Sequence, residues 1–562
     1  QPNRTGFPNF VAPQSTRKDE DQWGVRIDHN FSDRQMLFGR FSRYYVTQTT
    51  PGALPLDPSF SLNSGVNVAL HYTFVFNPTF LYDFTGGYNR ATIPFGNTPL
   101  GQDWRDAVGE NFAAPVALGF LPSTQSLVGS RFNSPSYVSY DLANPDDAYQ
   151  FNNAVHKVTG SHNFSFGFNV LHWRHHVGVQ GTSNLAYSQQ TTGLPGFTAT
   201  GESMASFFAG LPTSSSYGYG TPQNTHGNVY NGYAGDTWKI SSRLTLNYGL
   251  QYVYASPAIG DQLSLLDINI ARTQPLATDF SFAYLWASKN PITGAPPNTS
   301  RGIINPDRNN FAPRVGVAYS ITPRTVIRSG FGVFYDYNTN LIQNGPRGFR
   351  YPFAVSRAVG GQNLGIPGPY TLQNPYPPFT PSQATTIGTI DLNRRDPYAL
   401  EWNFGIQQSL TSNLLLTVDY VGTGGRKLTT NVQLNQAPAG PGAINPRRPF
   451  PNAPNAFIIA NIQNSNYNAL QTKLERRFAS GLTFRDSYTW SKCLDLDSDP
   501  NSAVMDYSYN LKYSYGPCTF HIHHVNTADF VYFLPFGRGK RFGAAAPAIV
   551  NAIMGGWEAS GV

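Results

Sequence analysis

The acidic segment DLDSDPNSAVMD combines residue types and spacing that could bind a cation. Oxygen-bearing side chains fall at positions 1, 3, 5, 7 and 12, as they do in a calcium-binding loop. These positions are Asp495, Asp497, Asp499, Asn501 and Asp506. The glycine required at position 6 is replaced by a proline, the bidentate glutamate at position 12 is an aspartate, and neither flank has a helical pattern. We therefore favour a solvated acidic loop and expect no bound metal.

Cysteines and histidines offer two further kinds of site. Cys493 and Cys518 are the only cysteines. An oxidising compartment would let them pair, constraining the loop between them by roughly 3 kcal/mol; two free thiols are the alternative. Histidines cluster at 172, 175 and 176 and again at 521, 523 and 524. Imidazoles can bind zinc, but no cysteine or acid lies close in sequence, and four strand residues separate two histidines by about 12 Å. We expect rim histidines.

Catalytic patterns are missing from the sequence. We find no nucleophile elbow, no HExxH motif and no paired carboxylates spaced for hydrolysis. The segment GESMASFFAGLP (201–212) predicts a short helix with Met204, Phe207 and Phe208 on one side, packed against neighbouring structure or gripping a ligand. The chain is not expected to be an enzyme or to hold a cofactor. The function must therefore be inferred from the strands and loops in which these residues lie.

The composition is poor in charge and rich in aromatic residues. Of 562 residues, 40% are hydrophobic, 14% aromatic and only 13% charged, with a mean hydropathy of −0.32. Soluble domains usually carry about 25% charged residues. We find no apolar run long enough for a membrane-spanning helix. The net charge of +7 is dispersed, with arginine pairs at 394–395, 447–448 and 476–477, so we expect no nucleic-acid partner.

Seven short turns alternate with long polar segments along the chain. The turns read FSDRQ (31–35), FNPTF (76–80), TGSHNF (159–164), ISSRLT (240–245), ITPRTV (321–326), LTSNLL (410–415) and FASGLT (478–483). The long segments span 46–65, 91–150, 176–225, 255–310, 337–396, 423–465 and 492–523. Tight turns at one end and long loops at the other are typical of a β-barrel in an outer membrane.

The runs that flank the turns alternate apolar and polar residues. In LTLNYGLQYVY (244–254), every second residue is leucine or tyrosine, over a length that lets a tilted strand cross a membrane. One face of such a strand meets lipid and the other meets the water-filled bore. Opposite the apolar faces of their strands lie nine charged residues that we expect to face the bore. They are Arg26, Asp28, Arg314, Arg328, Glu401, Asp419, Lys473, Glu475 and Arg485.

Counting hairpins gives the expected architecture. Seven hairpins give fourteen strands, and candidates at 524–534 and from Trp557 onward bring the total to 16. The segment 535–556 joins these two on the short-turn side and carries one helical turn. The fold class is all-β, an antiparallel transmembrane β-barrel with long extracellular and short periplasmic connections. Aromatic residues crowd the strand ends, as in the girdles of membrane barrels.

The chain resembles the barrel of TonB-dependent outer-membrane transporters, specifically their Oar-like group. The resemblance rests on segments that fall in family order, including DQWGVRIDHNFSDRQMLFGRFS (21–42), NVYNGYAGDTWKISSRLTLNYGLQY (228–252), NNFAPRVGVAYSITPRTVIRSGFGVFYD (309–336) and EWNFGIQQSLTSNLLLTVDYVGTGGRKL (401–428). Further segments are SNYNALQTKLERRFASGLTFRDSYTWSK (465–492), HHVNTADFVYFLPFGRGKRF (523–542) and GGWEASGV (555–562).

That resemblance implies more than this chain contains. Family members carry a carboxypeptidase-regulatory-like domain and a plug before a 22-stranded barrel. Residues 1–562 would then form one barrel domain of about 16 strands, truncated at both ends, without the plug and the TonB-binding box. The sequence starts with neither Met nor a signal peptide, which we interpret as an internal fragment. Expected partners are outer-membrane lipid and, through the upstream region, the TonB–ExbB–ExbD system.

The resemblance predicts an outer-membrane receptor that takes up a large solute, an oligosaccharide, a peptide or a chelate. The nine bore residues would hydrate the bore and bind the plug, while the loops select the solute. A structural or adhesive surface barrel, or a porin without energy coupling, is the alternative; a hydrolase would need a catalytic cluster that we do not find. Loop aromatics could stack on sugars, although we favour loop packing. They are Tyr284, Trp286, Tyr351, Tyr370, Tyr376, Tyr507 and Tyr509.

Overall fold

One large antiparallel sheet dominates the computed structural model. The structure describes residues 15–51, 59–92, 95–97, 124–127, 145–177, 181–194, 196–220, 223–337, 351–359, 371, 386–452, 455–498 and 507–562. Twenty strands of this part form the sheet. Sixteen of them pair in chain order, each antiparallel to the next, so the predicted number of strands is confirmed.

The sixteen strands are β1 (Arg17–Ser32), β2 (Gln35–Thr50), β3 (Ser59–Asn77), β4 (Phe80–Thr92), β7 (Pro145–Thr159), β8 (His162–Val177), β11 (Gln223–Lys239), β12 (Leu244–Ala255), β16 (Asn310–Thr322), β17 (Thr325–Tyr335), β20 (Tyr398–Thr411), β21 (Leu414–Gln433), β22 (Asn455–Ala479), β23 (Leu482–Asp495), β25 (His524–Phe533) and β26 (Glu558–Gly561). All seven predicted turns join consecutive strands of this series. Helix α5 (Ala548–Met554) lies in the connection from β25 to β26, where one helical turn was predicted.

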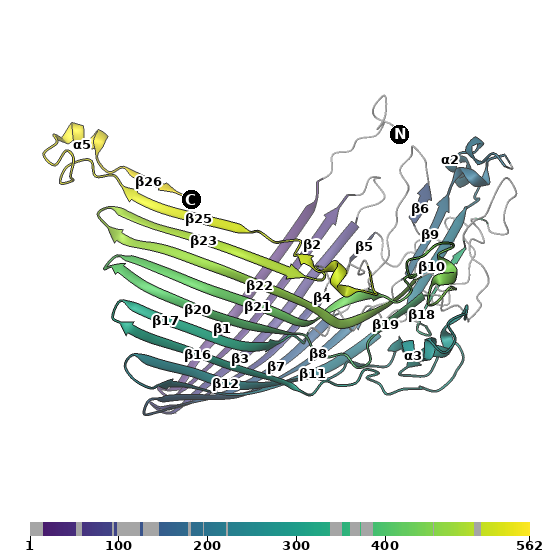
Figure 1. The fold of residues 1–562 in the computed structure, drawn as a ribbon, viewed down its shortest axis with the longest axis horizontal. Coiled ribbons are helices and arrows are strands. Elements are labelled where there is room, and N and C mark those ends of the chain that lie inside the picture. Colours follow the sequence, from purple (N-terminus) through teal and green to yellow (C-terminus); the bar gives the residue numbers. More distant parts are fainter. Residues whose placement is uncertain are drawn as a thin grey trace.

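The sheet curves strongly, so that β1–β11 lie behind β12–β25 in Figure 1. The short turns gather at the left of this view, and the loop elements at the right. Within the described residues, β1 and β26 are the edge strands and do not pair with each other. No helix in the described part of the chain has the length and apolar character needed to span a membrane.

Several strands run further at the loop end than expected. The predicted loop 423–465 is wrong at both ends, because the ladder between β21 and β22 continues to the pair Gln433–Phe457. It does so past irregularities near Leu428. Backbone pairing does not require alternating side chains once a strand has left the hydrocarbon layer, so the alternation pattern marks only the membrane-spanning part.

Smaller elements fill the loop end. Short strands β5 (Phe95–Asn97), β13 (Ile259–Gly260), β19 (Thr386–Ile390) and β24 (Gly516–Pro517) extend the main sheet. A second sheet contains β6 (Thr124–Leu127), β9 (Gly181–Tyr187), β10 (Ser214–Gly220) and β18 (Ala354–Val359), and a third contains β14 (Ser264–Leu266) and β15 (Tyr284–Trp286). The helices here are α2 (Ser203–Phe208) and α3 (Ile268–Ala271), with 3-10 turns at Gln189–Thr191, Thr198–Thr200, Ser281–Ala283, Asn445–Arg447 and Leu511–Ser514.

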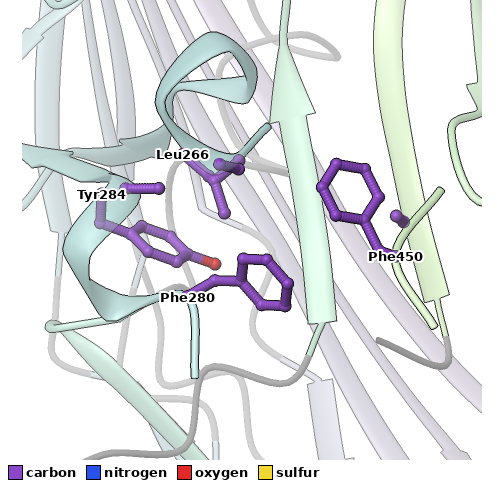
Figure 2. Packing of buried hydrophobic residues seen from close by; sticks show 7 residues of the cluster. Leu266, Phe280, Tyr284 and Phe450 are labelled. Atoms are coloured by element: carbon purple, nitrogen blue, oxygen red, sulfur yellow. The ribbon is translucent and has the colours of Figure 1, made fainter. Parts of the chain in front are cut away.

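The buried clusters of the described structure lie at the loop end, where they include loop residues and the ends of a few strands, and not along the membrane-spanning part of the sheet. Their largest fully buried side chains include Phe280, Tyr284 and Phe450, which come from segments some 170 residues apart and meet at one cluster (Figure 2). The rings of Phe280 and Phe450 meet edge to face at 5.7 Å. Leu263, Leu265 and Ile390 belong to an adjoining cluster. We call the two clusters together the loop platform.

Candidate functional site

The register places all nine predicted bore residues on one face of the main sheet. Directly paired residues of antiparallel strands share a face, and alternate residues change face. The direct pairs lead from Arg26 across the sheet to the rows of Arg314 and Arg328, and then to those of Asp419 and Glu475. All five residues therefore lie on the same face of the sheet. We call it the polar face. Asp28, Glu401, Lys473 and Arg485 share it.

The opposite face is apolar and uncovered. Phe166, Tyr248 and Phe404, predicted to meet lipid, are 47%, 44% and 46% exposed. Exposed apolar side chains recur on this face from Ile27 of β1 to Phe530 of β25. A soluble monomer rarely exposes an apolar patch larger than a few hundred Å². A face of this extent needs lipid to cover it, as the outer surface of a membrane barrel does.

Ion pairs hold part of the charge on the polar face. Arg26 and Asp28 approach to 2.6 Å on β1, and Lys473 and Glu475 to 2.7 Å on β22. Their side chains are about half exposed, so each pair adds little stability. Arg314 donates to Gln251 at 2.5 Å and lies 4.4 Å from the centre of the Phe334 ring. The face is therefore hydrated and close to neutral where its charges pair.

Four of the nine predicted residues, Arg314, Arg328, Glu401 and Asp419, make no ion pair with any described residue. A row across three strands contains two of them: Arg328 of β17 pairs in register with Gly405 of β20, which pairs in turn with Asp419 of β21. A Cβ on Gly405 would lie 1.9 Å from Asp419 Oδ1, so the glycine leaves space for that carboxylate. Glu401 lies between Gly332 and Thr423 in the same way. The polar face therefore carries charges that no ion pair with a described residue neutralises.

A concave region of about 550 Å³ lies mostly on the polar face of β8, β11, β12 and β16. Several carboxamides line it, including Asn169 and Asn231, which are in direct register, and Gln251, which bonds to Arg314. Tyr233 also lines it and lies over Gly167. Carboxamides both donate and accept hydrogen bonds without net charge. This sector can therefore bind polar neutral groups.

Sequence reasoning missed one charged partner on this face. Arg485 Nε donates to Asp529 Oδ1 at 2.8 Å, and the two residues are paired between β23 and β25. The alternating pattern of 524–534 places Asp529 on the face of the strand opposite to that of apolar Phe530, and this pattern could have predicted that Asp529 lies on the polar face. The pairing itself depends on the register of strands that lie 44 residues apart.

Two buried aspartates, Asp307 and Asp396, link the segment before β16 to the segment before β20. Arg395 and the backbone N–H of Asp396 both donate to Asp307, at 2.6 and 2.9 Å. Asp396 in turn accepts from Arg394 at 3.1 Å and from Asn310 at 2.8 Å. Burial raises the pKa of the Asp396 carboxyl above its usual range, although Arg394 opposes the shift. The arginine pair that looked dispersed in sequence thus has a structural role.

The two cysteines lie in a disulfide whose Cα atoms are 5.5 Å apart. Nearby, Asp495 accepts a hydrogen bond from Ser498 at 2.7 Å, and Asp497 accepts one from Thr430 at 2.9 Å. Of the calcium candidates, Asp499, Asn501 and Asp506 lie outside the described residues. In the part of the chain that is described, no group of three or more His, Cys, Asp or Glu is arranged to hold a metal ion.

Histidines at the loop end have protein partners. His172 and His176 share the apolar side of β8 and bond to Asn228 at 2.9 Å and Asn224 at 2.5 Å. His175 on the other face contacts Asp146, an acidic partner distant in sequence. His523 accepts from Trp490 at 3.1 Å, and His524 bonds with the Tyr488 hydroxyl at 2.8 Å. These contacts fit rim histidines.

The predicted helix in 201–212 is present, with one correction. Met204 and Phe207 of α2 pack against buried Leu185 and Tyr187. Phe208 was expected on the same side but is 81% exposed, because the helix has only six residues and its last one turns outward. Sequence periodicity does not fix the rotation of so short a helix about its axis.

Some of the predicted loop aromatics are packed in the loop platform, and others are exposed to solvent. Tyr284 is buried in the loop platform, Trp286 packs against it, and the Tyr351 ring lies 5.7 Å from that of Tyr284. Loop packing is confirmed for these three. Tyr509 is 51% exposed, with its ring 5.7 Å from that of Tyr507. Tyr370 and Tyr376 lie outside the described residues.

Together these features define an integral membrane wall with a lipid face and a polar face. The model of the outer membrane beta barrel domain family matches residues 1–562, and the chain belongs to that family. It is an integral β-barrel protein of the bacterial outer membrane.

Solved structures of outer-membrane proteins are similar to this chain at low sequence identity. The outer membrane transporter YddB from Escherichia coli is 12% identical, with a TM-score of 0.56 over 94% of this chain and 56% of that one. The ferric yersiniabactin uptake receptor FyuA from Yersinia pestis is 8% identical over 92% and 57% of the two chains, with a TM-score of 0.45. The FrpB iron transporter from Neisseria meningitidis is 10% identical over 92% of this chain and 58% of that one, with a TM-score of 0.46. The chain spans somewhat more than half of each, and among curated protein sequences none matches it.

Proposed function

We propose that this chain is the wall of a TonB-dependent outer-membrane receptor that takes up a large solute. The observation that carries the proposal is the pairing of a hydrated, charged polar face with a folded loop platform at one end of the same wall. A platform with its own buried core, including Phe280 and Phe450, holds loop surfaces in place for binding. The family assignment and the fold shared with the transporter YddB support it.

The nine residues of the polar face are proposed to line the bore. Their paired members hydrate it, and Arg328, Glu401 and Asp419 are free to bind a plug segment supplied by the complete protein. Charged side chains that face water cost little to keep there. Substitution of Asp419 by Asn is expected to loosen the plug and to leave solute capture outside the cell unchanged.

Exposed tyrosines near the disulfide are proposed to contact the solute. Tyr509 and Tyr513 are 51% and 71% exposed, and their rings both lie close to that of Tyr507, at 5.7 and 6.1 Å. Aromatic faces can stack on sugar rings or on the aromatic groups of a chelate. The solute class (oligosaccharide, peptide or chelate) is left to the experiment.

Uptake by whole cells tests the proposal. Cells that make the complete protein are offered labelled oligosaccharides, peptides and ferric chelates, with and without TonB and with and without an uncoupler of the inner membrane. We expect uptake of one class to require both TonB and the energised membrane. Uptake that persists without either would instead identify a porin, and surface binding without uptake would identify an adhesive barrel.

A further inference from the structure

The connection from β25 to β26 differs from the tight turns at the same end of the wall. Residues 535–556, which we call the α5 connection, fold back on themselves. The Gly537 N–H donates to the Phe542 carbonyl at 2.8 Å, and the Phe542 N–H donates to the Pro535 carbonyl at 2.9 Å. The Asn551 side chain of α5 accepts from the backbone N–H of Arg538 at 2.5 Å. The helix and the loop before it therefore form one unit with a defined surface.

That surface exposes large apolar side chains. Ile549 and Ile553 lie four residues apart, and thus on one face of α5, and they are 78% and 67% exposed. Phe542 and Trp557 beside the helix are also exposed. Asn551 is turned the other way, toward the loop to which it bonds. Large apolar side chains that are exposed together mark an interaction surface.

The end of α5 lies on the lipid side of the wall. Leu534 follows Phe530 by four residues and therefore shares its lipid face, and the Leu534 N–H donates to the carbonyl of Trp557 directly opposite at 2.9 Å. Trp557 Nε1 in turn donates to the Ile553 carbonyl at 2.7 Å. Because the Trp557 side chain points to the lipid side, the helix end that it contacts is on that side too. Figure 1 shows α5 at the end of the sheet where the short turns gather.

Basic residues accompany the apolar ones. Arg538, Lys540 and Arg541 are exposed, and no Asp or Glu occurs from 530 to 557, so two arginines and one lysine give this stretch a net charge of +3. None of the three makes an ion pair with a described residue. The Arg541 guanidinium lies 5.6 Å from the centre of the Phe542 ring. Apolar side chains next to unpaired basic ones are typical of a helix that lies in a membrane surface.

We propose that the α5 connection is an interfacial anchor that binds anionic phospholipid of the periplasmic leaflet. Short turns mark the periplasmic end of a membrane barrel. Ile549, Ile553 and Trp557 would enter the boundary between headgroups and acyl chains, as a continuation of the lipid face. Lys540 and Arg541 would contact the lipid phosphates through charge-assisted hydrogen bonds. A plug segment in the bore would meet the polar face, on the other side of the wall. The anchor is a property beyond solute uptake and does not depend on it.

The test identifies what covers residue 553 in the complete protein. Ile553→Cys is labelled with bimane, with the native disulfide intact, in nanodiscs of phosphatidylcholine that contain a minor fraction of phosphatidylglycerol. Phe208→Cys is the matched control, because Phe208 is also an exposed apolar residue of a short helix but belongs to α2 at the loop end. Each label is exposed in turn to lipid brominated in its acyl chains and to aqueous iodide. Both variants must keep the anomalous gel migration of the unboiled protein.

We expect brominated lipid to quench the label at 553 and iodide to quench the label at 208. At equal mole fraction, brominated phosphatidylglycerol should quench the label at 553 at least about threefold more strongly than brominated phosphatidylcholine, because basic residues at the surface concentrate anionic lipid around them. Lys540→Gln/Arg541→Gln should abolish this preference, and Lys540→Arg/Arg541→Lys should retain it. Arg538 is left in place, because its Nη2 donates to the Ala546 carbonyl within the connection.

Three results would overturn the proposal. Quenching of the label at 553 by iodide and not by lipid would place α5 in water. A label shielded from both reagents would show that protein covers the helix. Equal quenching by the two brominated lipids would contradict the binding of anionic phospholipid. Each result leaves the proposed uptake function standing, because none of these measurements involves a solute or TonB.

Discussion

Arg485 of β23 donates a hydrogen bond to Asp529 of β25 at 2.8 Å. On its other side it is paired in register with Glu475 of β22. Two carboxylates thus flank one guanidinium along a row perpendicular to the strands. Opposite charges in direct register stabilise adjacent strands by a few tenths of a kcal/mol to about 1 kcal/mol. On these three strands the polar face therefore exposes charge to water with opposite charges side by side.

Charge on the opposite face should be costly. Phe166→Arg places a guanidinium among the exposed apolar residues of β8 and should lower the free energy of unfolding by about 2–4 kcal/mol near mid-membrane. Urea titration of the protein folded in phosphatidylcholine vesicles measures this. Ser165→Arg, one residue away on the polar face, is the control and should change stability by much less. Equal costs for the two would argue against a lipid side and a water side.

Glycines opposite aromatic rings should be sensitive to a single methyl group. A Cβ on Gly167 would lie 2.3 Å from the Tyr233 ring, whereas one on Gly39 would have no atom within 4 Å. Gly167→Ala should therefore cost about 1–3 kcal/mol of stability through overpacking, and Gly39→Ala should cost little. In a Tyr233→Ala background the cost of Gly167→Ala should vanish. A cost that persists in that background would show that the ring is not its cause.

The disulfide should protect a loop and not the wall. It closes a segment of 25 residues, worth about 3 kcal/mol in the chain-entropy account. Cys493→Ser/Cys518→Ser, or reduction of the wild type, should speed proteolysis between 496 and 517 on intact cells. Anomalous gel migration of the unboiled protein should persist. Unchanged cleavage after reduction would contradict a protective role.

The buried contact between Asp396 and Asp307 at the start of β20 should strengthen as pH falls. The pKa of Asp396 is raised by burial in the folded protein, so the folded state binds the proton more tightly than the unfolded state does. The free energy of unfolding therefore rises as pH falls through the raised pKa, and this gain is absent well above it. Asp396→Asn should remove that part of the pH dependence, measured as protease resistance of 386–396 at several pH values. A profile identical to wild type would show that Asp396 does not titrate as expected.

Alternation and turn residues in the sequence predicted the strands and their two faces, but they could not predict contacts between residues far apart in the sequence. Each turn and each alternating run, such as 244–254, is set by neighbours within about ten residues, so strands and faces were predictable. The contact of Phe280 with Phe450 and the pair of Arg485 with Asp529 depend on strand register and loop folding over long separations.

Nitroxide labels on neighbouring residues of β20 test most directly that one face meets lipid and the other meets water. Phe404→Cys and Asn403→Cys are labelled in the otherwise intact protein, reconstituted in bilayers, and compared for collision with oxygen and with a water-soluble nickel complex. The label at 404 should collide mainly with oxygen and the label at 403 mainly with nickel. The reverse order, or two labels shielded from both reagents, would contradict the account.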